Sequence, residues 1–186
     1  MLSSEDSRKK YLWLNQFENR ANPLAHEMTT SKEILYIKGI DAVVTGIGTG
    51  GSYVGLKRGL LGSGIKVIGV QPRKGQKIQG LRNLNDSSYI PPIISGEADD
   101  GSLMEVEYNN VIWILEKMLE KYGILAGFSS GATAYLAYEL AKRGKKVIAI
   151  FADTGLNYVS LYESSGIKAC GYNFSRLYDL SSLPLL

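Results

Sequence analysis

The chain has 186 residues, of which 45% are hydrophobic, and its formal net charge is +3. This length and composition are ordinary for one globular domain that buries a core, and the small, evenly spread charge argues against a nucleic-acid partner. Because Cys170 and His26 are the only cysteine and histidine, we expect neither a disulfide framework nor a metal site.

The N-terminal residues 1–10 are charged where a signal peptide needs an apolar core, and no apolar run is long enough to span a membrane. We therefore expect a cytoplasmic protein without a membrane partner. Small-molecule chemistry is the expected function class.

The first predicted elements lie before residue 40. Residues 11–17 form an apolar-aromatic run with strand character. Asn22 as a cap and Pro23 at a first helical position predict a helical turn. Residues 30–33 read as a capping box that opens a second short helix. Between the two helices, His26 is expected to be a structural hydrogen-bonding group.

Residues 41–60 read as a strand, a glycine loop and a helix. Glycines without Cβ let the backbone approach an anion, and the free N–H groups and dipole of the following helix favour negative charge. Thr49 and Ser52 add hydroxyl donors. The pattern predicts a phosphate site, although a tight strand-to-helix connection is the alternative interpretation.

A nucleotide site is a second interpretation of the same loop. Its glycines satisfy G-x-G-x-x-G, but the next predicted strand, 66–70, lacks the acid that would bind the ribose of NAD. Arg73 or Lys74 could instead receive the extra phosphate of NADP. A Walker A site is excluded because the Gly-Lys-Ser/Thr ending is missing.

Strand, helix and strand within residues 41–70 form a βαβ unit and hence a parallel sheet. The loop 75–82 follows a strand, which is where ligands bind in open α/β sheets, but it also reads as a solvated loop. Residues 104–108 suggest a strand. From Asn109 to Gly123, apolar residues at helical spacing predict a helix that packs on the core.

A second small-residue loop, 123–132, leads into a helix predicted over 133–143. Ser129 and Ser130 could cap that helix or belong to a site. Residues 146–151 read as a buried parallel strand, followed by Asp153-Thr154-Gly155 as a turn or part of a site. The loops after Val44, before Gly131 and after Phe151 are expected to lie where one ligand touches all three. No constellation of nucleophile, base and orienting acid occurs.

Several motifs in order, from about Tyr11 to Glu163, resemble the cysteine synthase and cystathionine β-synthase family, whose members are pyridoxal-phosphate enzymes of the tryptophan-synthase-β fold type. The motifs are Asn15-Gln16-Phe17-Glu18-Asn19, Ala21-Asn22-Pro23 with His26, Gly46-Ile47-Gly48-Thr49-Gly50-Gly51, Lys77-Ile78-Gln79-Gly80, Gly127-Phe128-Ser129-Ser130-Gly131 and Asp153-Thr154-Gly155. The resemblance implies a three-layer, Rossmann-like α/β fold with a mostly parallel sheet, equivalent to the large domain of a fold-type-II enzyme.

The resemblance also implies the roles of individual residues. The cofactor phosphate would lie on the loop formed by Gly48, Thr49, Gly50, Gly51 and Ser52. Ser129 would contact the pyridine nitrogen, and Asp153 would lie near that ring edge. A hydroxyl at this nitrogen leaves the pyridine unprotonated, which suits β-elimination and replacement.

Substrate-binding roles fall on Arg82 and Gln79. Arginine at the position of Arg82 resembles the archaeal type that uses O-phosphoserine, and a guanidinium offers bidentate donors to a phosphate.

The departure from the family is in length. Members are much longer, and no motif here matches the segment that holds their Schiff-base lysine. We therefore expect a truncated member with a pyridoxal-phosphate-binding domain over 1–163, an unassigned tail over 164–186, non-covalent cofactor binding and no activity of the chain alone. The relatives replace the β-substituent of O-phosphoserine or O-acetylserine with sulfide to give cysteine. The alternatives are an NADP-type binder and a non-catalytic module that forms a homodimer or pairs with a full-length relative.

Overall fold

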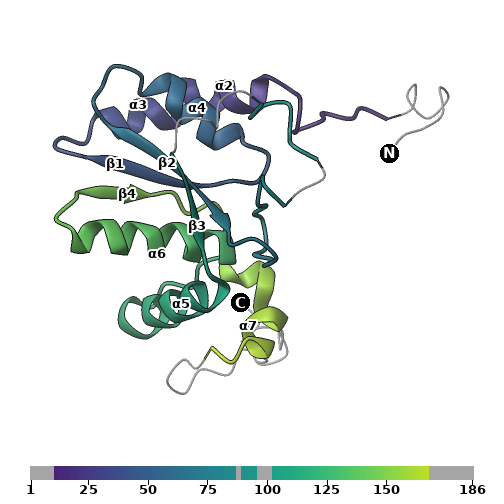
Figure 1. Cartoon of the computed structure of the whole chain (residues 1–186), viewed down its shortest axis with the longest axis vertical. Helices are drawn as coiled ribbons and strands as arrows, with labels where there is room; N and C mark the ends of the chain where they lie inside the picture. Colours follow the sequence, from purple (N-terminus) through teal and green to yellow (C-terminus); the bar gives the residue numbers. More distant parts are fainter. Residues whose placement is uncertain (1–10, 87–88, 96–101, 168–186) are drawn as a thin grey trace, which may run out of the picture.

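The fold is built on a parallel sheet with the strand order β3-β2-β1-β4 (Figure 1). The computed structural model describes residues 11–86, 89–95 and 102–167. The strands are β1 (Ala42–Gly46), β2 (Lys66–Pro72), β3 (Leu103–Val106) and β4 (Val147–Ala149). Val44 of β1 is in register with Ile68 of β2 and Ala149 of β4. The predicted parallel βαβ unit is thus confirmed.

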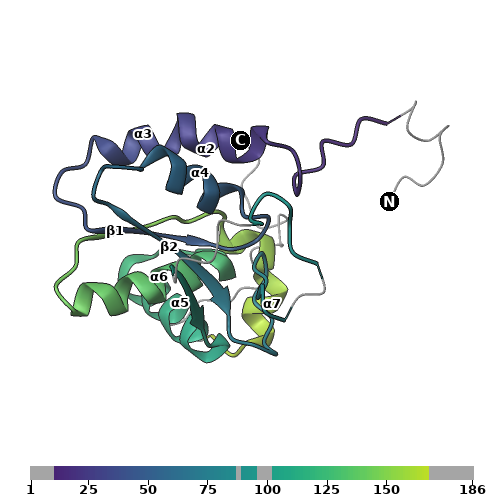
Figure 2. The ribbon, with the colours of Figure 1, turned by 45° about the horizontal axis from the view of Figure 1, so that its top comes forward.

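Helices cover both faces of the sheet, as Figures 1 and 2 show. One face carries α2 (Ala21–Met28), α3 (Thr30–Leu35) and α4 (Gly51–Gly59). The other face carries α5 (Tyr108–Tyr122) and α6 (Phe128–Lys142). A 3₁₀ turn, η1 (Gly155–Tyr158), leads into α7 (Val159–Ser164). This arrangement confirms the predicted three-layer α/β class.

Two hydrophobic cores lie on opposite faces of the sheet because successive strand side chains point to opposite sides. Val43 packs with the α4 side chains, whereas Val44 packs with α5 and α6. The stripe predicted on the helix after Asn109 is confirmed as core at Val111, Leu115 and Met118, which are buried, but it is wrong at Tyr122, which is exposed at the end of the helix.

Helices α2 and α4 approach closely because α4 presents glycines one turn apart. A Cβ on Gly55 would overlap the carbonyl oxygen of Pro23 and lie 2.8 Å from the His26 Cβ. A Cβ on Gly59 would lie 2.9 Å from the Glu27 carbonyl oxygen. The backbone of α2 therefore rests directly on the helix that follows the glycine loop.

The N-terminal predictions need correction. Residues 11–17 form no strand, because no described strand pairs with them, and Leu12 and Trp13 are exposed. The first helix begins at Ala21 rather than being capped by Asn22.

The predicted capping box at residues 30–33 is also wrong. Helix α3 begins at Thr30, and its N-cap, Thr29, forms no side-chain cap hydrogen bond. Because α2 ends immediately before this position, the Thr29 hydroxyl instead donates back to the carbonyl of Ala25 at 2.7 Å.

Three later predictions also change. Helix α6 begins at Phe128 instead of residue 133, so Ser129 and Ser130 lie in its first turn and do not cap it. The predicted Asn109 cap is wrong, since α5 already begins at Tyr108. The strand expected to be buried over 146–151 is the short, half-buried β4, because among the described strands it pairs with β1 alone.

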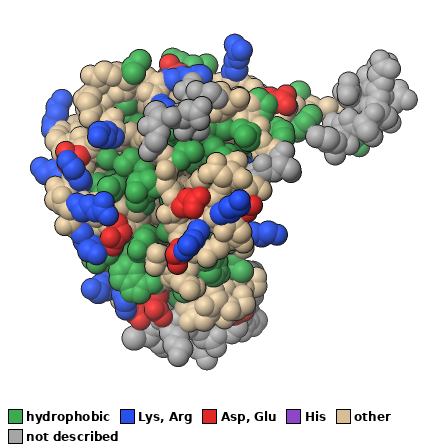
Figure 3. Space-filling model, in the orientation of Figure 1, with side chains coloured by type: hydrophobic (Ala, Val, Ile, Leu, Met, Phe, Trp, Pro, Cys, Tyr) green, Lys and Arg blue, Asp and Glu red, His purple; other side chains and the backbone are tan. Residues whose placement is uncertain are grey.

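On the face shown in Figure 3, Lys, Arg, Asp and Glu side chains are scattered among hydrophobic and other side chains. None of the helices that the structure describes is long and apolar enough to cross a membrane. Ile167 lies just beyond the predicted domain boundary at residue 163 and is buried in the core that the sheet forms with α5 and α6. Cys170 and the rest of the predicted tail from 168 onward lie outside the described residues.

Candidate active site

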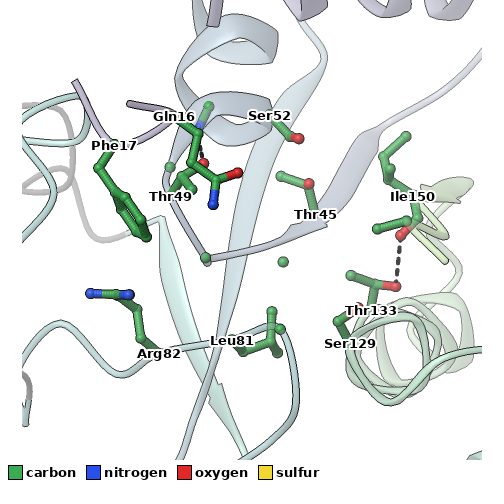
Figure 4. Close-up of a pocket in the computed structure, with 16 residues that line it drawn as sticks. Gln16, Phe17, Thr45, Thr49, Ser52, Leu81, Arg82, Ser129, Thr133 and Ile150 are labelled. Carbon is green, nitrogen blue, oxygen red and sulfur yellow. Dashed lines mark hydrogen bonds between the residues drawn. The ribbon is translucent and has the colours of Figure 1, made fainter. Parts of the chain in front are cut away.

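A pocket of about 480 Å³ opens at the carboxyl end of β1. The predicted loops after Val44, before Gly131 and after Phe151 all contribute to it, which confirms their expected convergence. Figure 4 shows Ser129 and Thr133 of α6 on one side and Phe17 and Arg82 at the other. The lining residues are Gln16, Phe17, Thr45, Gly46, Gly48, Thr49, Gly50, Gly51, Ser52, Gly80, Leu81, Arg82, Ser129, Thr133, Ile150 and Ala152.

The glycine loop forms one wall, between the end of β1 and the start of α4. Gly50 is the N-cap of α4 with φ of 88°, a left-handed conformation that favours glycine. A Cβ on Gly48 would lie 2.7 Å from the carbonyl oxygen of Gly80, so the loop packs directly on the neighbouring segment. The N-terminus of α4, where N–H groups and the helix dipole attract anions, therefore borders the pocket.

The hydroxyl of Thr49 has both of its acceptor positions in use. Its Oγ1 accepts from the side-chain Nδ2 of Asn22 at 3.0 Å and from the backbone N–H of Gly51 at 3.3 Å. A hydroxyl has two acceptor lone pairs and one proton to donate. The Thr49 hydroxyl can therefore form one more hydrogen bond, as a donor. An anion, which only accepts hydrogen bonds, is a suitable partner for it.

The hydroxyl of Ser52 faces the only histidine of the chain. Ser52 Oγ lies 2.9 Å from His26 Nε2, and His26 Nδ1 lies 3.2 Å from Thr30 Oγ1. Burial lowers the pKa of His26 below its ordinary value, which favours the neutral imidazole. The expected structural role of His26 agrees with these contacts, and they extend that role to the glycine loop.

The opposite wall comes from the first turns of α6. Ser129 and Thr133 line the pocket, and the Thr133 hydroxyl lies within hydrogen-bond distance of two carbonyls, that of Ser130 at 2.8 Å and that of Ile150 at 3.0 Å. The contact to Ile150 places α6 beside the residue that follows β4.

Asp153 lies behind this wall and does not line the pocket. Its Oδ1 accepts from the hydroxyls of Ser129 and Ser130, each at 3.4 Å, and its Oδ2 accepts from the Tyr158 hydroxyl at 2.6 Å. The hydrogen bond to Asp153, with burial, raises the pKa of Tyr158 to about 12. Asp153 thus contacts the pocket wall through Ser129, and its predicted place near the ring edge of a cofactor stays a prediction.

Arg82 lies against a pair of aromatic rings, Phe17 and Tyr89, at the other end of the pocket. Its guanidinium carbon is 5.1 Å from the ring centroid of Phe17 and 5.9 Å from that of Tyr89. The same guanidinium donates to the carbonyl of Tyr89 at 3.4 Å. These contacts hold a planar cation where the pocket opens.

Gln79 does not join the other predicted residues. It lines an adjacent hollow of about 410 Å³, which shares Leu81 and Arg82 with the main pocket. Its side-chain oxygen is buried and has no hydrogen-bond partner among the described residues. Its substrate-binding role stays a prediction.

Sequence reasoning missed several lining residues, chiefly Gln16, Phe17 and Thr133. Asn22 donates to the carbonyl of Gln16 at 2.8 Å, which fixes this segment beside the loop. Gln16 and Phe17 stood in a motif that carried the family resemblance, and that was the available signal. Thr133 follows the Ser-Ser-Gly motif by one helical turn, so its position depended on where α6 begins.

Comparisons with known proteins agree with this geometry. The family model described as "Pyridoxal-phosphate dependent enzyme" matches residues 2–153. Cysteine synthase of Staphylococcus aureus (strain Mu50) is 33% identical over 168 residues, covering 81% of this chain and 53% of the relative. Cysteine synthase of Aquifex aeolicus is 37% identical over 163 residues, covering 82% of this chain and 49% of the relative. The chain spans about half the length of these curated relatives.

Solved structures show the same likeness. An O-ureido-L-serine synthase superposes with a TM-score of 0.76 at 26% identity, covering 95% of this chain and 62% of that protein. A hydrogen sulfide-producing enzyme from Fusobacterium nucleatum superposes with a TM-score of 0.70 at 33% identity, covering 83% of this chain and 56% of that protein. With this fold, this glycine-loop pocket and a family match over most of its residues, the chain belongs to the family of pyridoxal-phosphate dependent enzymes.

Proposed function

We propose that residues 1–163 form a domain that binds pyridoxal phosphate non-covalently, with the cofactor phosphate on the glycine loop. The observation that carries this proposal is the Thr49 hydroxyl, whose two acceptor positions are used by Asn22 and Gly51 and whose proton is left for an anion. The backbone of Gly48, Gly50 and Gly51 and the hydroxyl of Ser52 complete the phosphate cradle.

The rest of the pocket fits the remainder of the cofactor. Ser129 would donate its hydroxyl proton to the pyridine nitrogen in place of its long, 3.4 Å hydrogen bond to Asp153. Bound there, pyridoxal phosphate supplies an electron sink for reactions at an amino-acid substrate. The residues of this chain would bind and orient the cofactor and the substrate. By resemblance to the family, a lysine would form the Schiff base, but no motif in this sequence matches the segment that holds it.

The substrate that we propose is a serine derivative with an anionic β-substituent, such as O-phosphoserine, for β-replacement by sulfide. Arg82 supports this choice because the two rings fix its guanidinium at the open end of the pocket. A fixed guanidinium can form two parallel hydrogen bonds with a phosphate, which an uncharged acetyl group cannot match.

The cofactor assignment is tested by titrating the purified chain with pyridoxal phosphate and recording visible absorption, before and after borohydride treatment and peptide mass analysis. We expect saturable binding without a trapped lysine, and about tenfold weaker binding in Thr49→Val because one hydrogen bond to a charged group is lost. Thr29→Val is the matched control, since Thr29 is exposed and its hydroxyl donates to the carbonyl of Ala25, away from the pocket. Equal affinity in wild type and Thr49→Val contradicts the cradle.

The substrate assignment needs a separate measurement. With pyridoxal phosphate bound, ³¹P NMR should detect O-phosphoserine binding that Arg82→Gln weakens. O-acetylserine, which has no phosphorus, is measured as a competitor that displaces O-phosphoserine, and it should bind weakly to both proteins. Preference of the wild type for O-acetylserine overturns the choice of substrate and leaves the cofactor assignment standing.

We also propose pairing through β4, which supports a second function as a partner module of a full-length relative. This strand pairs with β1 alone among the described strands, so its outer edge has unpaired backbone groups. Light scattering after chromatography, with and without a full-length cysteine synthase, tests this proposal. A monomer under both conditions contradicts it.

The NADP alternative has less support. Arg73, one of its two expected phosphate ligands, forms an ion pair with Glu107. Neither Arg73 nor Lys74 lines the pocket of the glycine loop. Thermal protection by NADP without protection by pyridoxal phosphate would restore this alternative.

A further inference from the structure

Two side chains of α2, one helical turn apart, reach the two hydroxyls of the glycine loop. Asn22 donates to Thr49, and His26 contacts Ser52. The position of α2 is fixed because its backbone packs against the glycines of α4, with the Cβ of His26 2.8 Å from the place of a Cβ on Gly55. His26 is therefore held at the loop by the backbone packing of two helices.

The protonation of His26 decides what Ser52 can offer. A neutral imidazole carries one N–H donor and one acceptor nitrogen. With the proton on Nε2, Thr30 donates to Nδ1, His26 donates to Ser52, and the Ser52 proton is free. With the proton on Nδ1, His26 donates to Thr30, and Ser52 must spend its proton on Nε2. The distances, 3.2 Å to Thr30 and 2.9 Å to Ser52, allow both arrangements.

An anion distinguishes the two arrangements because it can only accept hydrogen bonds. We propose that His26 is a positioning residue of the phosphate site: an anion on the loop selects the tautomer with the proton on Nε2, so that the Ser52 hydroxyl donates to the anion. The inference rests on the proposed phosphate site. In this arrangement His26 occupies one acceptor position of Ser52, and the Ser52 proton stays free to donate to the anion.

The neutral form that the inference needs is favoured because His26 is half-buried, which lowers its pKa. Thr30 is half-buried in the first turn of α3 and faces the ring from the far side. The ring is thus bracketed by hydroxyls, each of which can donate or accept, and the ligand decides the direction.

Because His26 is the only histidine of the chain, NMR can read its tautomer without an assignment problem. Long-range ¹H–¹⁵N spectra would be recorded at about pH 8, above the ordinary histidine pKa. The probes are pyridoxal phosphate, inorganic phosphate and pyridoxal, which lacks the phosphate. We expect the Nε2–H pattern with both phosphate compounds and no change with pyridoxal.

The outcomes separate this inference from the proposed function. Binding of pyridoxal phosphate with the proton on Nδ1, or with an unchanged mixture of tautomers, overturns the role of His26 and leaves the cofactor assignment standing. Binding of inorganic phosphate with the Nε2–H pattern, but no binding of pyridoxal phosphate, supports the role of His26 and overturns the cofactor assignment. Binding of neither compound overturns both.

Variants test whether the contact is more than structural. His26→Leu should weaken pyridoxal phosphate binding about tenfold, whereas His26→Gln, whose amide can donate to Ser52, should restore most of the affinity. In a Ser52→Ala background, His26→Leu should cause no further loss of affinity, because this double-mutant cycle measures the coupling between His26 and Ser52. Circular dichroism checks that each variant folds. Equal losses of affinity in His26→Leu and His26→Gln contradict the inference, and so do additive losses when His26→Leu is combined with Ser52→Ala.

Discussion

Asn22 Nδ2 lies 3.0 Å from Thr49 Oγ1, a hydrogen bond between side chains 27 residues apart. The same amide donates to the carbonyl of Gln16 at 2.8 Å. One side chain thus connects the N-terminal segment, α2 and the glycine loop. Through this connection, a helix that does not itself line the pocket decides which way a pocket hydroxyl points.

Replacing Asn22 by alanine should therefore weaken pyridoxal phosphate binding about three- to tenfold, the effect of losing about one hydrogen bond. Asn19→Ala is the matched control, because Asn19 is exposed and its side chain bonds to Leu14 and Ala21 and not to the glycine loop. Absorbance titration measures both variants. A similar loss in the two variants would mean that the N-terminal segment as a whole, not the contact to Thr49, supports binding.

Gly55→Ala should destabilise the fold by about 1–3 kcal/mol, the usual cost of inserting a methyl group into a packed interior. The new Cβ would overlap the Pro23 carbonyl, and α2 would have to move away from α4. Urea denaturation measures the loss. Asn109→Ala, on the exposed side of α5, serves as the control. Stability unchanged from wild type in Gly55→Ala would contradict the close packing of the two helices.

Phe17→Leu should weaken the binding of O-phosphoserine while leaving the binding of pyridoxal phosphate near the wild-type value. The ring lies 5.1 Å from the Arg82 guanidinium and restrains it, although it does not supply the charge. The effect should be smaller than that of Arg82→Gln, and Phe17→Tyr should rescue it. ³¹P NMR titration makes the comparison. Loss of cofactor affinity in Phe17→Leu would show instead that the ring shapes the whole pocket.

Tyr158→Phe should lower the free energy of unfolding at neutral pH by about 1–3 kcal/mol, because the hydroxyl donates to a charged partner, Asp153. The pKa of Tyr158 in the folded protein is raised from 10.0 to about 12, so the folded state favours the protonated phenol. This stabilisation is complete below about pH 10 and is lost as the pH rises through about 12.

The difference in unfolding free energy between wild type and Tyr158→Phe should consequently shrink with rising alkaline pH. Denaturation curves at several pH values, with Tyr122→Phe on the exposed end of α5 as control, measure it. A difference that stays constant across this range would mean that the hydroxyl stabilises the fold by packing alone.

The sequence by itself was enough for the parallel βαβ unit, the glycine loop and the family. Each of these depends on residues close together in the chain: an apolar run, glycines before a helix, and small-residue motifs in a fixed order. Local backbone geometry follows from such patterns, because glycine conformation and helix polarity are set mostly by neighbouring residues.

Only the tertiary structure decided what surrounds that loop. Residues 11–17 look like a strand locally, but a strand needs a partner, and here they pass beside the pocket and contribute Gln16 and Phe17 instead. His26 and Asn22 acquire their roles from the close packing of α2 on α4, which brings together side chains 26 and 27 residues apart. Sequence spacing does not encode such hydrogen bonds, because they depend on how two helices pack in space.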